Sequence, residues 1–345
     1  MRPSPRVFPR ARTAKLGFAA LVLALATSAA VANRAFADAA PVCEGRDLSE
    51  SAEIKPDFAA HADDLVNGEG LLWKVEKPGL APSYLYGTIH STNSAAVALA
   101  KQAAAYLEGA KSVATELGGP MDATAKVDLS SGMLRAALSP AEDSLAGAMP
   151  AEDVNVVDRY MSAHGYPKEM AHHLALWFLA VAASEPACET EGAQQGLPEV
   201  DEYIAGFARD HGLPVVALET VAEQMRTLTS VPRDLAATML LATARAPRMN
   251  DDAYATLLAL YIRKRPAFAT AILDALPGLT ARERVAEDEF TRLLLFGRNE
   301  AMMQRMAPLL EKGGAFVAVG ALHLSGKDGL IERARAENYR VTKVW

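Results

Sequence analysis

The sequence predicts an α/β (α+β) protein whose mixed central sheet is assembled from both ends of the chain and capped by large helical insertions. Short β-favouring runs lie near the start, between 71 and 117, and at the end, between 315 and 344. The long middle is rich in helix-forming residues and interrupted by prolines. Two β-favouring runs, one from each end, finish in the same motif, Gly-x-x-His. A sheet that joins the two ends would bring these motifs to one edge.

The first 37 residues have the composition of a secretory signal peptide. Basic residues precede an apolar core from Leu16 to Ala32, and small residues up to Ala37 offer cleavage positions. The apolar core is short and alanine-rich for a membrane span, which needs about 20 apolar residues. We therefore expect cleavage near Ala37, a periplasmic or secreted protein, and no stable membrane insertion.

The rest of the chain is long enough for one large domain. The parts that we expect are a flexible tail (38–55), one domain (56–345) and its mainly helical insertions (121–196 and 222–310). Half of the residues are hydrophobic and the net charge is −7, with no basic stripe. Nucleic acid is therefore not expected as a partner.

Cys43 and Cys188 are the two cysteines of the chain. In an oxidising compartment an even pair is typical of a disulfide, which here would tie the tail to the middle of the chain. Two unpaired thiols are the alternative. A zinc site is disfavoured, because neither cysteine belongs to a Cys-x-x-Cys pair.

The N-terminal β-favouring runs predict a hairpin, a helix and a third strand. Leu71–Glu76 and Tyr84–Tyr86 favour strands, and Lys77-Pro78-Gly79 between them favours a turn. Ala95–Gly109 is alanine-rich and ends at a glycine, as helices often do. Ser112–Leu117 is a further apolar run, closed by two glycines and a proline. These elements supply one side of the predicted sheet.

The later runs predict the rest of the sheet. Val200–His211 favours a helix, and Leu213–Glu219 favours a strand that ends in an acid. At the end of the chain Ala315–Val319 favours a strand, Asp328–Glu337 a helix and Tyr339–Val344 a last strand. Strand therefore alternates with helix at both ends of the chain.

Each Gly-x-x-His motif ends in a histidine that directly follows a predicted strand: His90 and His323. Histidine suits metal ligation or proton transfer near neutral pH. The glycine allows the backbone to turn close to a ligand. Either histidine alone fits a loop or a helix terminus. Their shared setting indicates one composite site.

Two glutamates occupy equivalent positions, because Glu116 and Glu219 each end an apolar run. A buried carboxylate is costly without a partner, so each should face water, a cation or a donor. Glu219 with Thr220 also fits the start of a helix. Two histidines and two glutamates match Mn²⁺, Zn²⁺ or Co²⁺. They equally match a metal-free site with a histidine base, and spacing does not decide between these.

Several other chemistries find no support. The sequence has no Gly-x-Ser-x-Gly elbow, no P-loop and no Gly-x-Gly-x-x-Gly fingerprint, so no nucleotide cofactor is expected. His172 and His173 lie in a helical run beside Leu174 and Trp177, and adjacent residues do not share a helix face. We interpret both as packing or surface residues.

Taken in order, the motifs are specific at both ends and less so in the helical middle. They are Tyr86-Gly-Thr-Ile-His-Ser91, Val113-Ala-Thr-Glu-Leu117, Pro214-Val-Val-Ala-Leu-Glu-Thr220 with Gln224, Gly297-Arg-Asn-Glu-Ala-Met302 and Val317–Leu330. This series resembles the TraB/PrgY/GumN family over nearly the whole chain that follows the predicted signal peptide. That family is grouped with the Tiki metalloproteases, the erythromycin esterases and the ChaN-like haem-binding lipoproteins.

The resemblance implies an active site built from histidines and glutamates on a mixed sheet with helices. By position, His90 and His323 match the paired histidines, and Glu116 and Glu219 match the two acids. Arg298 matches the arginine of an Arg-Asn element, where it could hold a carboxylate or stabilise an oxyanion.

The chain departs from the family pattern at one acidic element. Asp201 matches the aspartate of a Gly-x-Asp element, but Glu199 stands where glycine is common. The chain therefore keeps only the aspartate of this element.

The Tiki-like relatives imply metal-dependent peptide hydrolysis. We expect a divalent metal (Mn, Co or Zn) held by His90, Glu116 and His323. The expected function is an exported metal-dependent protease or peptidase that acts on a peptide or small-molecule substrate. The alternatives are a metal-free esterase-like hydrolase, a periplasmic protein that binds metal or haem without turnover, and a protein that sequesters a peptide.

Overall fold

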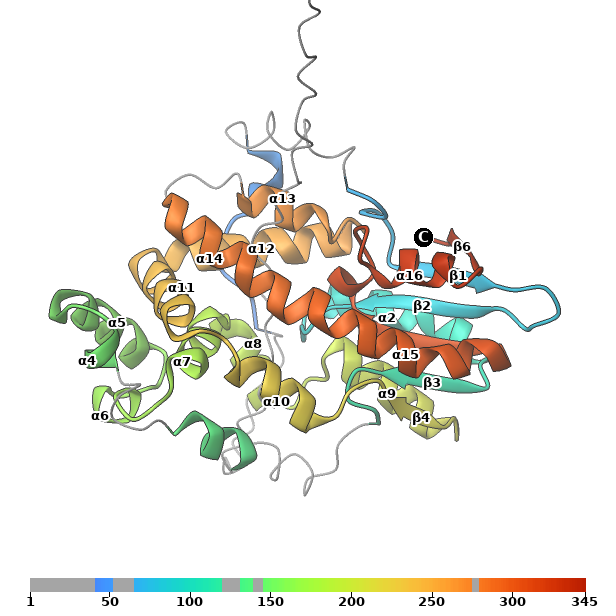
Figure 1. Ribbon diagram of the computed structural model, residues 1–345, viewed down its shortest axis with the longest axis horizontal. Coiled ribbons are helices and arrows are strands. Elements are labelled where there is room, and N and C mark those ends of the chain that lie inside the picture. Colours follow the sequence, from blue (N-terminus) through green and yellow to red (C-terminus); the bar gives the residue numbers. More distant parts are fainter. Residues whose placement is uncertain (1–40, 52–64, 120–130, 139–144, 275–278) are drawn as a thin grey trace, which may run out of the picture.

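A computed structural model describes residues 41–51, 65–119, 131–138, 145–274 and 279–345. The predicted signal peptide lies outside these residues. Figure 1 shows a sheet with its covering helices on one side of the molecule and a lobe of helices on the other. Within the described ranges, no helix is both long enough and apolar enough to cross a membrane.

The sheet is mixed. Its strands are β1 (Leu72–Glu76), β2 (Ser83–Thr88), β3 (Ser112–Thr115), β4 (Val215–Ala217), β5 (Ala315–Gly320) and β6 (Arg340–Lys343). In the described part of the chain they form one six-stranded sheet in the order β4-β3-β5-β2-β1-β6. β4, β3, β5 and β2 run parallel, whereas β1 is antiparallel to both of its neighbours. The predicted fold class is confirmed, because β5 from the C-terminal end lies between β3 and β2.

Most of the other described residues are helical (Figure 1). Besides a helical stretch at residues 131–137, the α-helices with four or more residues are α2 (Ser94–Leu107), α4 (Leu145–Ala148), α5 (Ala151–Ala163), α6 (Lys168–Ala171), α7 (Leu176–Ser184), α8 (Ala187–Gln194), α9 (Val200–Asp210), α10 (Val221–Thr229), α11 (Arg233–Arg245), α12 (Pro247–Ile262), α13 (Phe268–Asp274), α14 (Ala281–Thr291), α15 (Gly297–Lys312) and α16 (Leu330–Ala336).

The helix starts follow local chemistry. Prolines immediately precede α5, α6, α8 and α11, since proline is tolerated where an amide hydrogen bond is not needed. The Asn93 side chain accepts a hydrogen bond from Ala95 N at 2.9 Å and caps α2. Thr220 and Glu223 form a capping box that starts α10. These caps fix where the chain leaves the sheet edge.

The two faces of the sheet are covered by different helices. Phe316 and Ala318 of β5 pack with α2, α9 and α12, whereas Val317 and Val319 of β5 pack with α15 and α16. Alternate residues of a strand point to opposite faces, so a strand buried on both faces is apolar throughout. This explains the uninterrupted apolar run before the second Gly-x-x-His motif.

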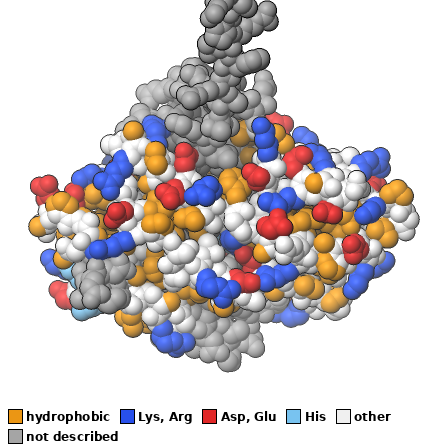
Figure 2. All heavy atoms as spheres, in the orientation of Figure 1, with side chains coloured by type: hydrophobic (Ala, Val, Ile, Leu, Met, Phe, Trp, Pro, Cys, Tyr) orange, Lys and Arg blue, Asp and Glu red, His pale blue; other side chains and the backbone are white. Residues whose placement is uncertain are grey.

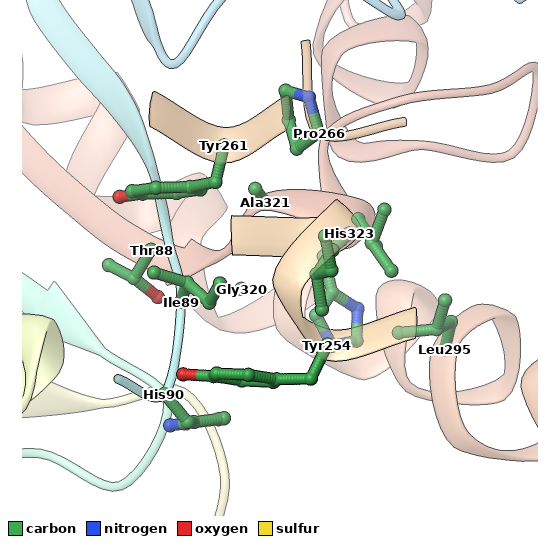
Figure 3. Close-up of a pocket in the computed structure, with 12 residues that line it drawn as sticks. Thr88, Ile89, His90, Tyr254, Tyr261, Pro266, Leu295, Gly320, Ala321 and His323 are labelled. Atoms are coloured by element: carbon green, nitrogen blue, oxygen red, sulfur yellow. The ribbon is translucent and has the colours of Figure 1, made fainter. Parts of the chain in front are cut away.

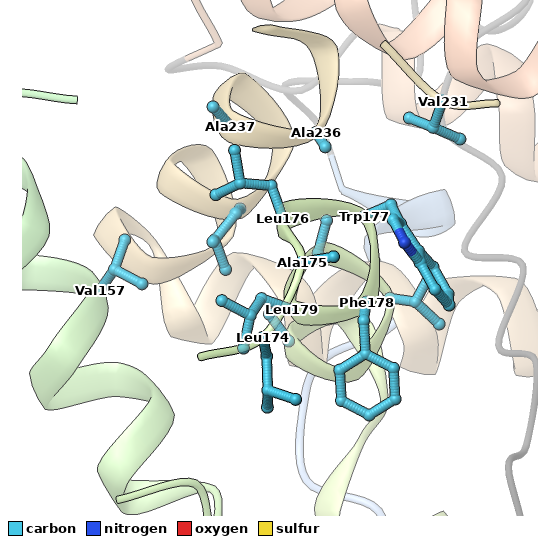
Figure 4. Close-up of a cluster of buried hydrophobic side chains, with 14 of the residues drawn as sticks. Val157, Leu174, Ala175, Leu176, Trp177, Phe178, Leu179, Val231, Ala236 and Ala237 are labelled. Atoms are coloured by element: carbon cyan, nitrogen blue, oxygen red, sulfur yellow. The ribbon is translucent and has the colours of Figure 1, made fainter. Parts of the chain in front are cut away.

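The helical lobe has a core of its own. Figure 4 shows Leu176 and Leu179 of α7 packed among residues of neighbouring helices, including Val157 and Ala236. The lobe therefore adds a second packed unit next to the sheet.

The surface carries charges of both signs. On the molecular face in Figure 2, acidic and basic side chains are interspersed.

Cys43 and Cys188 form a disulfide with a Cα–Cα distance of 5.0 Å, as the sequence predicts. Cys188 lies on α8, so the bond fastens the segment before the sheet to this helix.

Removing the disulfide should destabilise the protein. We expect the double variant Cys43→Ala/Cys188→Ala to lose about 2–5 kcal/mol of unfolding free energy, because the cross-link spans 145 residues and restricts the unfolded chain. Urea denaturation without reductant measures this loss. With reductant, the unmodified chain should unfold at the same urea midpoint as the variant. Equal urea midpoints of the two proteins without reductant would contradict the expectation.

Candidate functional site

The two Gly-x-x-His motifs lie side by side at the carboxyl ends of β2 and β5. These strands are parallel neighbours, with Gly87 opposite Val319 in the register. A Cβ atom on Gly87 would lie 2.9 Å from the Cα and Cβ atoms of Ala321, closer than real Cβ atoms approach. The glycine of the first motif is therefore needed because the second motif packs directly against its backbone.

His90 faces two carboxylates from the start of α9. Its Nδ1 atom is 3.4 Å from Glu199 Oε2 and 3.4 Å from Asp201 Oδ2. One ligand atom from each of the three side chains lies within 4.8 Å of the others, as a shared metal ion would require. Thr88 Oγ1 donates to Asp201 Oδ1 at 2.8 Å and fixes that carboxylate. The His90 side chain keeps 22% exposure, so the cluster is partly accessible.

The acids dominate the electrostatics of His90. Burial alone would lower the pKa of His90, but Asp201 and Glu199 outweigh it and raise that pKa to about 10. Burial raises the pKa of Asp201 to about 6, although His90 opposes this. Two acids that face one imidazole favour a positive charge at this position, either a proton on His90 or a bound metal cation.

His323 is in a contrasting setting. It is fully buried in a short 3₁₀ turn, and its Nδ1 lies 2.6 Å from Asn299 Oδ1. Asn299 Nδ2 donates to the Asp328 carbonyl at 3.0 Å, so the amide oxygen faces the imidazole. His323 Nδ1 therefore carries the proton and Nε2 presents a lone pair.

The Nε2 atom of His323 has no hydrogen-bond partner among the described residues. Burial lowers the pKa of His323 to about 4, although Glu116 opposes this. The imidazole is therefore neutral near pH 7. An orphaned buried acceptor of this kind is uncommon in folded proteins.

Glu116, Glu219 and Arg298 form a buried ion-pair network between the strand ends and α15. Arg298 Nε donates to both oxygens of Glu219, at 2.9 and 3.0 Å. Arg298 Nη2 donates to Glu116 Oε2 at 2.5 Å and also contacts Glu219. The second Glu116 oxygen accepts from Gly320 N at 2.8 Å. The network thus joins the ends of β3, β4 and β5.

This network holds its charges strongly. Burial would raise the pKa of Glu116, but Arg298 and the two histidines outweigh it and lower that pKa to about 2. Burial likewise opposes the charge of Arg298, but the two glutamates raise its pKa above the usual range. Glu116 and Arg298 therefore stay charged, and the Arg298 guanidinium is occupied by carboxylates.

The predicted site residues thus fall into two groups. His90 and His323 line one pocket. Glu116, Glu219 and Arg298 do not line it and instead bind one another. Glu116 Oε1 lies 3.9 Å from His323 Nε2, but both Glu116 oxygens already accept hydrogen bonds. The metal set predicted from the sequence, which includes Glu116, stays a prediction.

Glu199 was not predicted as part of the site, and Asp201 was suggested only by the family resemblance. Both stand in the first turn of α9 or just before it. Acids are common at helix starts because they favour the positive end of the helix dipole. Their sequence position therefore carries no signal that separates a site residue from an ordinary helix start.

His90 and His323 line an apolar pocket of about 50 Å³ (Figure 3). Tyr254 and Tyr261 of α12 and Leu295 contribute to its walls. Leu295 belongs to a π-helical stretch, Arg292–Phe296, and such stretches often occur at functional sites. The pocket therefore pairs polar groups at the strand ends with apolar walls, as ligand sites commonly do.

A comparison with known protein families matches residues 71–343, most of the chain. The chain belongs to the TraB/PrgY/gumN family. The match includes both Gly-x-x-His motifs and Arg298, so the resemblance seen in the motifs is confirmed. No curated protein and no solved structure matches the chain. Family membership thus supports the motifs but specifies no substrate.

Breaking the buried network should be costly. We expect Arg298→Met to lower the free energy of unfolding by about 3–5 kcal/mol, because it leaves Glu116 and Glu219 buried without a cation. Urea denaturation measures the loss. Arg305→Met is the matched control, since Arg305 pairs with Glu223 while 38% exposed, and water screens such a pair so that its loss should cost much less. Equal losses in the two variants would contradict the expectation.

Proposed function

We propose that this protein is an exported hydrolase that uses a divalent cation held by His90, Glu199 and Asp201. The observation that carries the proposal is the convergence of one imidazole and two carboxylates beside a pocket. An imidazole nitrogen with carboxylate oxygens suits Mn²⁺, Co²⁺ or Zn²⁺. When bound, the cation would polarise a substrate carbonyl and lower the pKa of a bound water.

The chain's own residues supply the rest of the chemistry. The His323 Nε2 lone pair can accept a hydrogen bond from a water or from a substrate N–H group. Asn299 holds the imidazole in the tautomer that leaves this lone pair free. Arg298 acts indirectly. It binds Glu116, and Glu116 in turn accepts a hydrogen bond from the backbone amide of Gly320.

The pocket walls favour an uncharged substrate group beside the reacting bond. Leu257, Tyr261 and Pro266 offer apolar surface next to the two histidines. Burying a charged group against such walls would be costly. A peptide or a small amide or ester with an apolar group next to the cleaved bond fits this environment.

Metal content tests the proposal. We expect near-stoichiometric metal after loading the full-length chain with Mn²⁺, Co²⁺ or Zn²⁺, and loss of that metal in His90→Ala and Asp201→Asn. His172→Ala is the matched control, because His172 also pairs with an acid, Asp158, at 2.8 Å but does not line the pocket. Inductively coupled plasma mass spectrometry measures the metal, and peptide-cleavage screens follow.

Two results would contradict the proposal: no metal in the unmodified chain, or full metal in His90→Ala. Loss of metal in His323→Ala as well would support the ligand set predicted from the sequence. A second candidate, metal-free hydrolysis, is favoured by the Nε2 atom of His323, which has no hydrogen-bond partner in the described part of the chain. Activity without metal that disappears in His323→Ala would support that candidate.

A further inference from the structure

Glu189 is a buried carboxylate that sequence analysis did not identify. It lies on α8 and is 3% exposed. One oxygen accepts from Ser91 Oγ at 2.7 Å and from the Tyr254 hydroxyl. The other accepts from Thr92 N at 2.6 Å and from Thr92 Oγ1 at 2.8 Å. Four donors therefore converge on one side chain.

These donors belong to the parts of the chain that build the pocket. Ser91 and Thr92 directly follow His90, and Tyr254 forms a wall of the pocket in Figure 3. The Ser91 carbonyl also accepts from Val200 N at 3.3 Å, at the start of α9 between the two acids that face His90. Glu189 thus lies where the His90 turn, α8 and α12 meet.

The backbone of α8 packs tightly against the same turn. A Cβ atom on Gly192 would lie 2.1 Å from Thr92 Oγ1, so α8 approaches the turn as closely as glycine permits. Cys188, the residue before Glu189, is fastened to Cys43 by the disulfide. The helix that carries Glu189 is therefore fixed both by its close contact with Thr92 and by the disulfide.

We propose that Glu189 is a positioning residue that holds His90 against Glu199 and Asp201. Glu189 does not line the pocket, and its four hydrogen bonds fix the turn that carries His90. Outer contacts of this kind orient the groups that bind a metal and alter metal affinity when they are removed. The metal part of this inference rests on the proposed function, whereas the positioning part rests on the contacts alone.

The role depends on hydrogen-bond acceptors more than on charge. A glutamine at this position keeps one oxygen for the two donors of Thr92. Its amide group can donate to the hydroxyls of Ser91 and Tyr254, because a hydroxyl accepts as well as donates. An alanine leaves the buried Thr92 N–H without an acceptor and opens a void. Glu189→Gln should therefore rescue what Glu189→Ala loses.

The experiment compares Glu189→Ala, Glu189→Gln and Leu240→Ala in the full-length chain. Leu240 is buried in the helical lobe, away from the pocket, and its truncation controls for a general loss of stability. The first measurement is the NMR spectrum of the His90 imidazole in metal-free protein, assigned with His90→Ala. The second is Mn²⁺ affinity by calorimetry under conditions where every variant is folded.

We expect Glu189→Ala to shift or broaden the His90 signals and to weaken Mn²⁺ binding about 10–100-fold. Glu189→Gln and Leu240→Ala should stay close to the unmodified chain in both measurements. The proposal is overturned if Glu189→Ala only lowers the melting temperature, as Leu240→Ala does, and leaves the His90 signals and Mn²⁺ affinity unchanged.

Two further results keep the test decisive. If the unmodified chain binds no Mn²⁺, the proposed function fails, and the His90 signals of metal-free protein still decide the positioning role. If Glu189→Ala does not fold, Thr92→Val takes its place, since it removes one donor to Glu189 at nearly constant shape. A smaller change of the His90 signals in the same direction supports the proposal, and unchanged signals overturn it.

Discussion

The buried ion pairs of Arg298 with Glu116 and Glu219 are the interaction on which the site depends. One guanidinium joins the carboxylates that follow β3 and β4, and Glu116 also binds the backbone amide of Gly320 at the end of β5. Removing charges from water is costly, and only close geometry with further hydrogen bonds offsets that cost. The network therefore constrains three strand ends and the start of α15 to one arrangement.

This arrangement gives two histidines opposite electrostatic properties around one pocket. His90 faces the two acids at the start of α9 and favours a positive charge, whereas His323 is buried beside Asn299 and stays neutral. Neighbouring titratable groups with opposed pKa values commonly mark acid, base or ligand roles. The two Gly-x-x-His motifs therefore give one pocket two chemically distinct sides.

The sequence predicted the sheet from both chain ends because each strand there is a short apolar run with its own turn signals. It predicted the paired histidines because their local settings are alike. Contacts between distant segments left no local signal: Glu189 lies 98 residues from Ser91, and Glu199 resembles an ordinary acid at a helix start. The predicted third and fourth strands extended to Leu117 and Glu219, yet β3 ends at Thr115 and β4 at Ala217.

Anomalous diffraction from crystals grown with Mn²⁺ tests the central claim most directly, because it locates the metal rather than counting it. The account predicts a peak bounded by His90 Nδ1 and the carboxylates of Glu199 and Asp201. A peak on His323 Nε2 and Glu116 instead, or no peak in the pocket of a fully Mn²⁺-loaded crystal, would contradict it.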